Sequence, residues 1–483
     1  MKAMNRKIGV GVLWNLTGLL VSRGASTLFM LFLARILAPE AFGLVAMVTV
    51  VFELANAFVS SGLGAALIRS KNVSDVDLST VFYMNLVLSL LAYLLIYFGA
   101  PYISVFYSQS ELTPLVRVMG LVVFINATKI VQVAILSRNM NFKHQMKANT
   151  LGVIVSGCLA LVAAWIGWGV WSLVVQMLGS ALISAIVLWF ASAWRPSLQV
   201  SGESFWRLFR FGKNLLAEGL LDVIYQNSFV LVIGRFFSAE ITGLYFIAKK
   251  ISNLLSQQLT GAVQQATYPA LSTLQDDNAA LLLKYRKIMQ LMMFVIAPVM
   301  GLMAGVSPVL FAVFFDDRWG GAVPYLQLLC IVGALYPLHA LNMNLLNVKG
   351  RSDLIFKVGL VKKSVNISML VAAVPYGVFG IVCSQVLGSC LALIPNTYYS
   401  SRLVGYSPLN QFRDAVKPLA SSVLAGGGAW YLANTGLMPD VPMLIVALLM
   451  GGAIYVVVSV LFRVEGGVMV CNKVSGNFRW DGR

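Results

Sequence analysis

Long apolar runs follow one another from end to end of the chain, separated by short polar or basic segments. Runs of about 20 residues are long enough to cross a hydrocarbon core of about 30 Å as a helix. The alternating pattern of a membrane-spanning strand is absent. The sequence therefore predicts an all-α, polytopic membrane protein with about fourteen transmembrane helices. The predicted spans cover residues 11–34, 41–66, 80–102, 115–137, 148–168, 171–192, 213–235, 241–264, 288–315, 325–347, 359–376, 379–400, 415–434 and 441–462.

Parts of the chain recur about 200 residues further on. The passage "LARILAPEAFGL" ends at Leu44, and Arg35, Glu40, Gly43 and Leu44 match Arg235, Glu240, Gly243 and Leu244 of "IGRFFSAEITGL". A second stretch, from Leu115, matches the stretch from Tyr325. Six spans separate the copies, so both copies have the same orientation, as parallel repeats do. We expect two facing six-helix lobes, residues 1–200 and 201–410, followed by two extra spans and a short tail, residues 411–483.

Composition and charge agree with this reading. Hydrophobic residues make up 59% of the 483 and charged residues 11%, far from the averages of soluble domains. With the N-terminus placed in the cytoplasm, 27 of the 35 Lys and Arg residues fall on the cytoplasmic side. Basic residues prefer that side, so both termini are predicted to be cytoplasmic. The same asymmetry accounts for the net charge of +17 and gives no reason to expect nucleic-acid binding.

Several kinds of chemistry are not indicated by any motif. The sequence has no phosphate-binding GxxxxGK[ST] loop, no GxSxG elbow and no cysteine spacing typical of a disulfide framework or a metal site. It has two histidines, far apart, and scattered acids outside the cytoplasm. We therefore expect no enzyme, no catalytic residues, no cofactor and no metal. The stretch 192–213 between the lobes is basic and aromatic, and is either an interfacial helix or a plain linker.

Charged residues inside the predicted spans are the candidates for function. Each full charge near the membrane centre costs about 2.5–3.5 kcal/mol on insertion scales, which indicates a protein or water-filled interior. Lys129 and His339 occupy equivalent places in the two repeats, at an offset of 210. The candidates near the midplane are Arg23, Glu53, Lys129, Lys249, Lys250 and His339, while Glu218 and Asp222 lie nearer the cytoplasm.

Most of these residues also have a purely structural explanation, whereas Lys129 has no acid in its own hairpin that could pair with it. Arg23 and Glu53 can form a buried ion pair, and Glu218 with Asp222 can neutralise Lys249 or Lys250. His339 can be hydrogen-bonded by Asn342 or Asn344 without further purpose. Amides in the same regions either hold helices together or line a hydrated cavity that suits sugars. These amides are Gln257, Gln258, Gln264 and Gln265 in one span and Asn342, Asn344 and Asn347 in another.

Three stretches resemble those of the Wzx-type polysaccharide flippases (O-antigen and colanic acid type) of the multidrug/oligosaccharidyl-lipid/polysaccharide exporter superfamily. They are "LARILAPEAFGLVAMVTVVFELANAFVSSGLGAALIRSKN" from Leu33, "TYPALSTLQDD" from Thr267 and "WGGAVPYLQLLCIVGAL" from Trp319. The resemblance covers most of the chain to about residue 400. It implies a bacterial inner-membrane transporter that moves an undecaprenyl-diphosphate-linked oligosaccharide from the cytoplasmic to the periplasmic leaflet by alternating access.

An anionic diphosphate suits guanidinium and ammonium donors. On this interpretation the substrate-binding residues are Arg23, Lys129, Lys249, Lys250, His339, Gln257, Gln258, Asn342 and Asn344. The candidates for proton or sodium coupling are Glu53, Glu218 and Asp222. The expected partners are the lipid-linked oligosaccharide, membrane lipids, and a polysaccharide polymerase with its chain-length regulator. Two alternatives stay open: a cation-coupled multidrug exporter of the same superfamily, and a non-transporting scaffold of a polysaccharide assembly complex.

Overall fold

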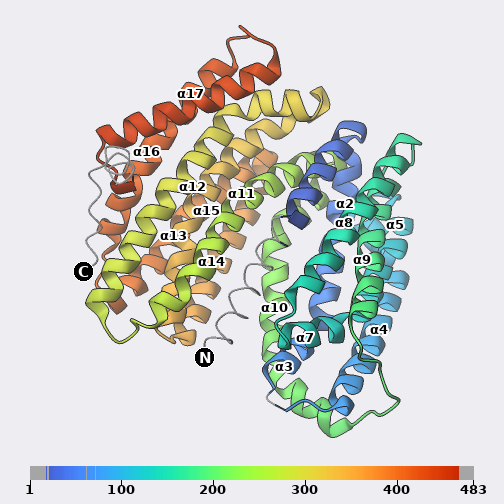
Figure 1. Cartoon of the computed structure of the whole chain (residues 1–483). Helices are drawn as coiled ribbons and strands as arrows, with labels where there is room; N and C mark the ends of the chain where they lie inside the picture. Colours follow the sequence, from blue (N-terminus) through green and yellow to red (C-terminus); the bar gives the residue numbers. More distant parts are fainter. Residues whose placement is uncertain (1–17, 19–20, 61, 71, 467–483) are drawn as a thin grey trace. The chain divides into compact units, whose positions relative to one another are not determined.

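The computed structural model describes residues 18, 21–60, 62–70 and 72–466. All regular elements in these ranges are helical. The chain divides into two compact units, residues 1–243 and residues 244–483. Figure 1 shows the labelled helices of both units. The prediction of an all-α membrane protein is confirmed, whereas the lobe boundaries at residues 200 and 410 stay a prediction.

The first unit begins with a helix over residues 21–36. α10 packs against α2, α3 and α4, and α8 packs along α9. α10 thus belongs to this unit, although the repeat places it at the start of the second lobe. The helices are α2 (Pro39–Ser60), α3 (Leu63–Arg69), α4 (Asp75–Tyr107), α5 (Leu112–Met119), α6 (Leu121–Ala127), α7 (Ile130–Arg138), α8 (Phe142–Trp165), α9 (Trp171–Ala191) and α10 (Gly202–Phe236). The first residues of α11 (Ala239–Ser272) complete the unit.

The second unit contains the rest of α11. α12 is its central element and packs against α13, α16 and α17. α13 and α14 both pack against α15. The remaining elements are α12 (Asn278–Phe314), η1 (Asp317–Ala322), α13 (Val323–Val348), α14 (Ser352–Ala373), η2 (Val374–Tyr376), α15 (Gly377–Val404), α16 (Pro408–Ala433) and α17 (Asp440–Leu461).

The described part of the chain contains 10 stretches of helix that are long and apolar enough to span a membrane. One of them, residues 352–404, includes both α14 and α15. α11 and α16, which match predicted spans, are not among the ten. The predicted first span, 11–34, begins outside the described residues. A multi-pass membrane protein is therefore confirmed, and the count of fourteen spans is not.

The predicted span 115–137 is not one continuous helix. It breaks into α5, α6 and α7, with interruptions at Gly120 and at Thr128–Lys129. At the second break the Lys129 amide donates to the Asn126 carbonyl, 3.2 Å away, and the Thr128 hydroxyl donates to the Ile125 carbonyl. The backbone contact of Lys129 spans three residues, which is the tighter turn of a 3₁₀ helix. The interruption places Lys129 at a helix junction.

The two copies of the repeated passage cross each other at the starts of α2 and α11. A Cβ atom on Gly43 would lie 1.7 Å from the carbonyl oxygen of Ala239. A Cβ on Gly243 would lie 1.9 Å from the carbonyl oxygen of Pro39. Both pairs of equivalent positions, Gly43 with Gly243 and Pro39 with Ala239, are 200 residues apart. The glycine of each copy therefore packs against the backbone of the other copy. The close approach of two backbones requires glycine at both positions.

A similar close approach joins α12 and α16 in the second unit. A Cβ on Gly305 would lie 2.3 Å from the carbonyl oxygen of Gly426, and one on Gly426 would lie 2.4 Å from that of Gly301. The Ser422 hydroxyl donates to the Ala297 carbonyl, 2.6 Å away, across the same contact. Small residues that let helix backbones approach are typical of helix packing in membranes. Gly426 of α16 therefore has a packing role.

At one end of this contact, Arg286 of α12 pairs with Asp414 of α16 at 2.6 Å, and the Tyr406 hydroxyl also donates to this carboxylate. Asp414 directly precedes the predicted span 415–434. Burial alone would raise the pKa of the Asp414 carboxyl, but hydrogen bonds from Arg286 and Tyr406 outweigh it and hold the pKa below its usual value. The ionised carboxylate therefore stabilises the folded state.

Replacing Asp414 with asparagine should lower the free energy of unfolding at neutral pH by about 1–2 kcal/mol. This is the energy of one hydrogen bond to a charged group, reduced because the arginine partner is exposed and solvent screens the interaction. A carboxyl with a lowered pKa stabilises the fold above its unfolded-state pKa and loses this effect as the pH falls. The difference in thermal midpoint between wild type and variant, measured in detergent, should shrink on acidification. The exposed Asp276 provides the control substitution, D276N. A D414N difference that is constant with pH would contradict this explanation.

Candidate functional site

The first unit contains an open cavity of about 530 Å³. Its wall is mainly apolar, with contributions such as Ile68 of α3 and Val223 of α10. Among the described residues that line it, Lys129 is the one cation and Glu53 is the one acid. The other strongly polar residues on the wall are Asn56 of α2 and Asn126 of α6. A few polar groups in an apolar wall are typical of a binding cavity.

Lys129 reaches the cavity from the junction between α6 and α7. Its Nζ donates to the Ser184 hydroxyl of α9, 2.8 Å away, and this hydroxyl donates in turn to the Ala181 carbonyl at 3.0 Å. The lysine side chain is half-buried and Ser184 is 2% exposed. One serine oxygen leaves the other protons of the ammonium group available, because an ammonium has three donors.

Glu53 lies on α2 and also faces the cavity. The side-chain amide of Asn227, on α10, donates to the Glu53 carboxylate and to the Val223 carbonyl. Asn126 donates to the Asn56 side-chain oxygen at 3.4 Å. Within the described residues Glu53 forms no ion pair with Arg23, so the structural alternative proposed for these two residues is not observed.

The remaining first-unit candidates do not line this cavity. Arg23 is exposed on the helix over residues 21–36, and Glu218 is exposed on α10. Asp222 is half-buried and accepts a hydrogen bond from Gln226 at 2.8 Å, one residue before the cavity-lining Val223. The structure therefore brings Lys129 and Glu53 together and leaves the other three charged candidates off the cavity wall.

The second unit repeats the contact between a basic residue and a serine. His339 Nε2 lies 3.0 Å from the Ser389 hydroxyl, and its Nδ1 lies 2.8 Å from the Asn396 side-chain nitrogen. An amide nitrogen only donates, so this assignment gives a neutral imidazole with its hydrogen on Nε2. Ser184 and Ser389 come from the sixth span of each repeat, α9 and α15. The equivalence of Lys129 and His339 thus has a structural counterpart.

The asparagines of α13 have structural surroundings. Asn342 is fully buried, accepts from the Tyr285 hydroxyl at 3.1 Å and donates to Gln411 at 3.0 Å. It holds α12, α13 and α16 together, which is the structural explanation given for such amides. Asn344 is also buried, and its side-chain nitrogen has no hydrogen-bond partner among the described residues. A substrate-binding role for both residues stays a prediction.

The candidates on α11 differ in exposure. Lys249 is half-buried, whereas Lys250 is exposed with its Nζ 5.7 Å from the centre of the Phe246 ring. Gln257 is exposed and Gln258 is half-buried. Further along the helix, Gln264 donates to the Ala340 carbonyl of α13 at 2.8 Å. The substrate-binding assignments of the two lysines, Gln257 and Gln258 also stay predictions.

Sequence reasoning missed several polar residues of these sites. Asn56, Asn126, Asn227 and Ser184 are short polar residues inside apolar runs, and Asn126 lies three residues before Lys129. It also missed a lysine, Lys362, which falls inside the predicted span 359–376. Lys362 is half-buried on α14. Its position inside a span was the available signal.

The long apolar helices of the described residues place this molecule in the class of multi-pass helical membrane proteins. The chain belongs to the polysaccharide biosynthesis protein family, whose model matches residues 32–324. It is 25% identical over 403 residues to the lipopolysaccharide biosynthesis protein WzxC of Escherichia coli (strain K12), covering 82% of this chain and 81% of that protein. It is 26% identical over 331 residues to the succinoglycan biosynthesis transport protein ExoT of Rhizobium meliloti (strain 1021), covering 68% and 66%.

Solved structures share the fold. The lipid II flippase MurJ, in an inward closed conformation, superimposes with a TM-score of 0.75 at 14% identity, over 94% of this chain and 99% of that one. An inward-facing multidrug resistance MATE family transporter of the MOP superfamily has a TM-score of 0.59 at 18% identity, over 78% and 95%. The resemblance to Wzx-type polysaccharide proteins is confirmed by the family match and by WzxC.

Proposed function

We propose that this protein is a transporter, and not an enzyme, that flips undecaprenyl-diphosphate-linked oligosaccharide repeat units from the cytoplasmic to the periplasmic leaflet by alternating access. The flipped units would feed the assembly of capsule, exopolysaccharide or O-antigen. Family membership supports the pathway, and the names of WzxC and ExoT refer to lipopolysaccharide and succinoglycan biosynthesis. The observation that carries the proposal is the cavity with Lys129 on its wall, inside a unit built of membrane-spanning helices.

The cavity has groups for the two polar parts of such a substrate. The Lys129 ammonium, held by Ser184, is a donor for the anionic diphosphate. The amides of Asn56 and Asn126 suit neutral sugar hydroxyls, because an amide both donates and accepts. The polyprenyl chain stays in the lipid, so only the head group crosses the polar interior. Arg23, Lys249, Lys250 and His339 are further proposed anion contacts of the transport cycle.

Glu53 is the proposed coupling residue that shares a cavity with Lys129. Binding of a proton or sodium ion at its carboxylate would raise the positive charge around the substrate, whereas release would lower it. Glu218 and Asp222 stay secondary candidates. The protein is proposed to lie in the bacterial inner membrane with both termini cytoplasmic, alongside a polysaccharide polymerase and a chain-length regulator.

Deletion of the gene in its host tests the transport function. We expect lipid-linked oligosaccharide to accumulate on the cytoplasmic leaflet and surface polysaccharide to fall, since the head group cannot cross the membrane unaided. Labelling of the glycan in intact and in opened spheroplasts measures the leaflet distribution. Wild-type protein supplied from a plasmid should restore both quantities. Surface polysaccharide that stays intact in the deletion strain would contradict the proposal.

A cation-coupled drug exporter is the second candidate, favoured by the acidic Glu53 in the cavity and by the MATE-like fold. Such an exporter needs acids for organic cations and would tolerate the loss of Lys129. Increased sensitivity of the deletion strain to cationic drugs, without accumulation of lipid-linked oligosaccharide, would favour this function. A non-transporting scaffold would tolerate neutral substitutions at both Lys129 and Glu53.

A further inference from the structure

The segment between α9 and α10 lies at the membrane surface by its place in the chain. The span formed by α9 ends at Ala191, and the next candidate span begins at Leu216. Residues 192–215 therefore connect two membrane-spanning helices on one side of the bilayer. From Gly202 onward this connection is already helical, as the first turns of α10. These turns precede the apolar part of the helix.

One face of these first turns packs onto the first unit. Leu208 is 3% exposed and belongs to an apolar cluster that includes Leu67 and Phe82. Phe205 and Phe209 pack against the same cluster, and their rings stack with centres 5.3 Å apart. The segment is therefore anchored by apolar contacts and is not a freely moving linker.

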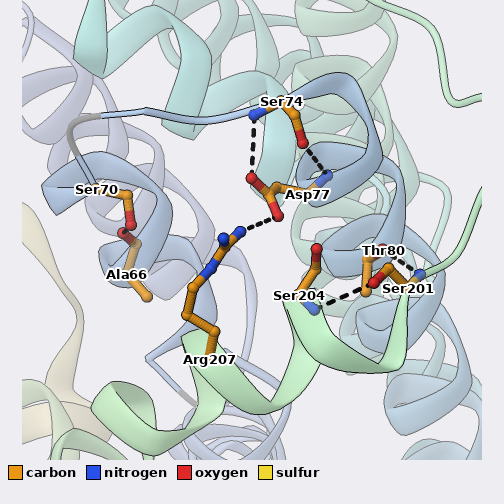
Figure 2. Close-up of polar contacts among 8 residues, drawn as sticks. All are labelled: Ala66, Ser70, Ser74, Asp77, Thr80, Ser201, Ser204 and Arg207. Atoms are coloured by element: carbon orange, nitrogen blue, oxygen red, sulfur yellow. Dashed lines mark hydrogen bonds and ion pairs between the residues drawn. The ribbon is translucent and has the colours of Figure 1, made fainter.

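Polar contacts fix the same turns to the start of α4 (Figure 2). Arg207 pairs with Asp77, whose carboxylate also accepts from the Ser74 amide at 3.0 Å in a capping box. The Ser201 amide donates to the Thr80 hydroxyl at 3.0 Å. A capping box and a charge-assisted contact both restrict the geometry of the groups they join. The opposite face of the segment is therefore held in a defined direction.

The segment exposes apolar and charged side chains. Trp206 is 64% exposed, and Arg210, four residues further along α10, is also exposed. Before the helix, Leu198 is 91% exposed and Val200 is 57% exposed. Water would solvate the three apolar side chains poorly, whereas the membrane interface favours tryptophan and lets arginine reach the phosphates. Other basic residues lie at the same end of the unit, near residues 72–74 and 139–141. They are Arg69, Arg138, Lys143, Lys147 and Arg195.

We propose that residues 198–210 form a docking surface for the head groups of anionic phospholipids. Trp206 and Leu198 enter the interfacial layer, and Arg210 contacts lipid phosphate. The surface is continuous with the membrane that α9 and α10 cross. Glu203 is also exposed on these turns and offsets one positive charge, so the charge that complements an anionic leaflet comes from Arg210 together with the neighbouring basic residues. Because Asp77 and Thr80 hold the segment, lipid binding at this surface is coupled to the position of α10, whose residue Val223 lines the cavity.

Lipid binding to the purified full chain tests the proposal. We expect native mass spectrometry to detect bound phosphatidylglycerol in preference to phosphatidylcholine. The double variant Trp206→Ser, Arg210→Gln should weaken phosphatidylglycerol binding by about fivefold or more, since one arginine near an anionic surface contributes about 1 kcal/mol. The control Trp168→Ser removes a similarly exposed tryptophan, 55% exposed, from the loop between α8 and α9 and should change nothing. Equal binding by wild type and double variant would overturn the proposal.

Fluorescence quenching gives an independent readout that does not depend on affinity. The difference in tryptophan emission between the wild type and the variant Trp206→Phe gives the contribution of Trp206. In vesicles containing phosphatidylglycerol, we expect lipids brominated near the head group to quench this contribution and aqueous iodide to quench it weakly. Strong iodide quenching without lipid quenching would place the segment in water and overturn the proposal. Both variants leave the buried face and the Arg207–Asp77 pair intact, so folding should be preserved.

Discussion

Replacing Lys129 with methionine is expected to lower the rate of flipping by about ten- to a hundredfold. The substitution keeps the length of the side chain but removes the one cation among the described residues of the cavity wall. A hydrogen bond to a charged group is worth about 1.5–3 kcal/mol, and about 1.4 kcal/mol corresponds to a factor of ten. The rate can be measured with a fluorescent lipid-linked oligosaccharide in proteoliposomes, by the fraction that becomes accessible to a quencher outside.

Two further variants separate loss of charge from loss of structure. Lys129→Arg keeps a cation that can still reach Ser184, and it should retain most of the activity. Lys417→Met removes an exposed lysine of α16 and should flip at the wild-type rate. The three variants Lys129→Met, Lys129→Arg and Lys417→Met should have similar thermal midpoints. Methionine packs at least as well as a half-buried lysine, so Lys129→Met should not destabilise the fold. Wild-type flipping by Lys129→Met would show that the cavity does not bind the diphosphate through this residue.

Substituting Gly43 with alanine should destabilise the protein by about 3 kcal/mol, at the upper end of what overpacking costs. The added methyl group would lie 1.7 Å from the Ala239 carbonyl oxygen, and both positions are fixed by helix backbone. No side-chain rotation can relieve such a contact, so the two helix starts must separate. A lower thermal midpoint in detergent and a lower yield of folded protein are the measurements.

The matching substitution Gly243→Ala should have a similar effect, since its methyl group would meet the Pro39 carbonyl oxygen at 1.9 Å. Gly261→Ala, on the same helix α11, is the control. Nothing lies within 4 Å of a Cβ at that position, and alanine favours helix over glycine by about 1 kcal/mol, so this variant should be unchanged or more stable. An unchanged midpoint for both Gly43→Ala and Gly243→Ala would show that the crossing can relax.

Much of the fold could be predicted because membrane-spanning helices must be long and apolar. The repeat was also visible, since residues such as Gly43 and Gly243 keep their spacing. The break before Lys129 was not visible, because "LVVFINATKIVQVAIL" has no proline and its only signals are small and polar residues. A helix interruption of this kind depends on tertiary contacts, such as the bond from Lys129 to Ser184.

The candidate site was predicted less completely than the fold. An unusual charge such as Lys129 or Glu53 stands out in an apolar run, because its burial is costly. Whether an amide packs or lines a cavity depends on which helix face meets which neighbour. Asn342 and Asn126 look alike in sequence, but the first is fully buried against Tyr285 while the second faces the cavity. Sequence patterns do not contain this information, since it arises only when the helices pack.

The crossing of Gly43 and Gly243 also bears on how such a chain can arise by gene duplication. Gly43 meets the carbonyl group of Ala239, and Gly243 meets the carbonyl group of Pro39. Pro39 and Ala239 are equivalent positions of the two copies, 200 residues apart. Such a reciprocal pair of contacts, in which residue i of one copy meets residue j of the other and residue j of the first meets residue i of the second, is the mark of a two-fold interface between identical subunits. A single-lobe ancestor that paired with itself would already have contained this contact, and fusion would have retained it. After fusion, neither glycine could drift alone, because the partner backbone of the other copy constrains it.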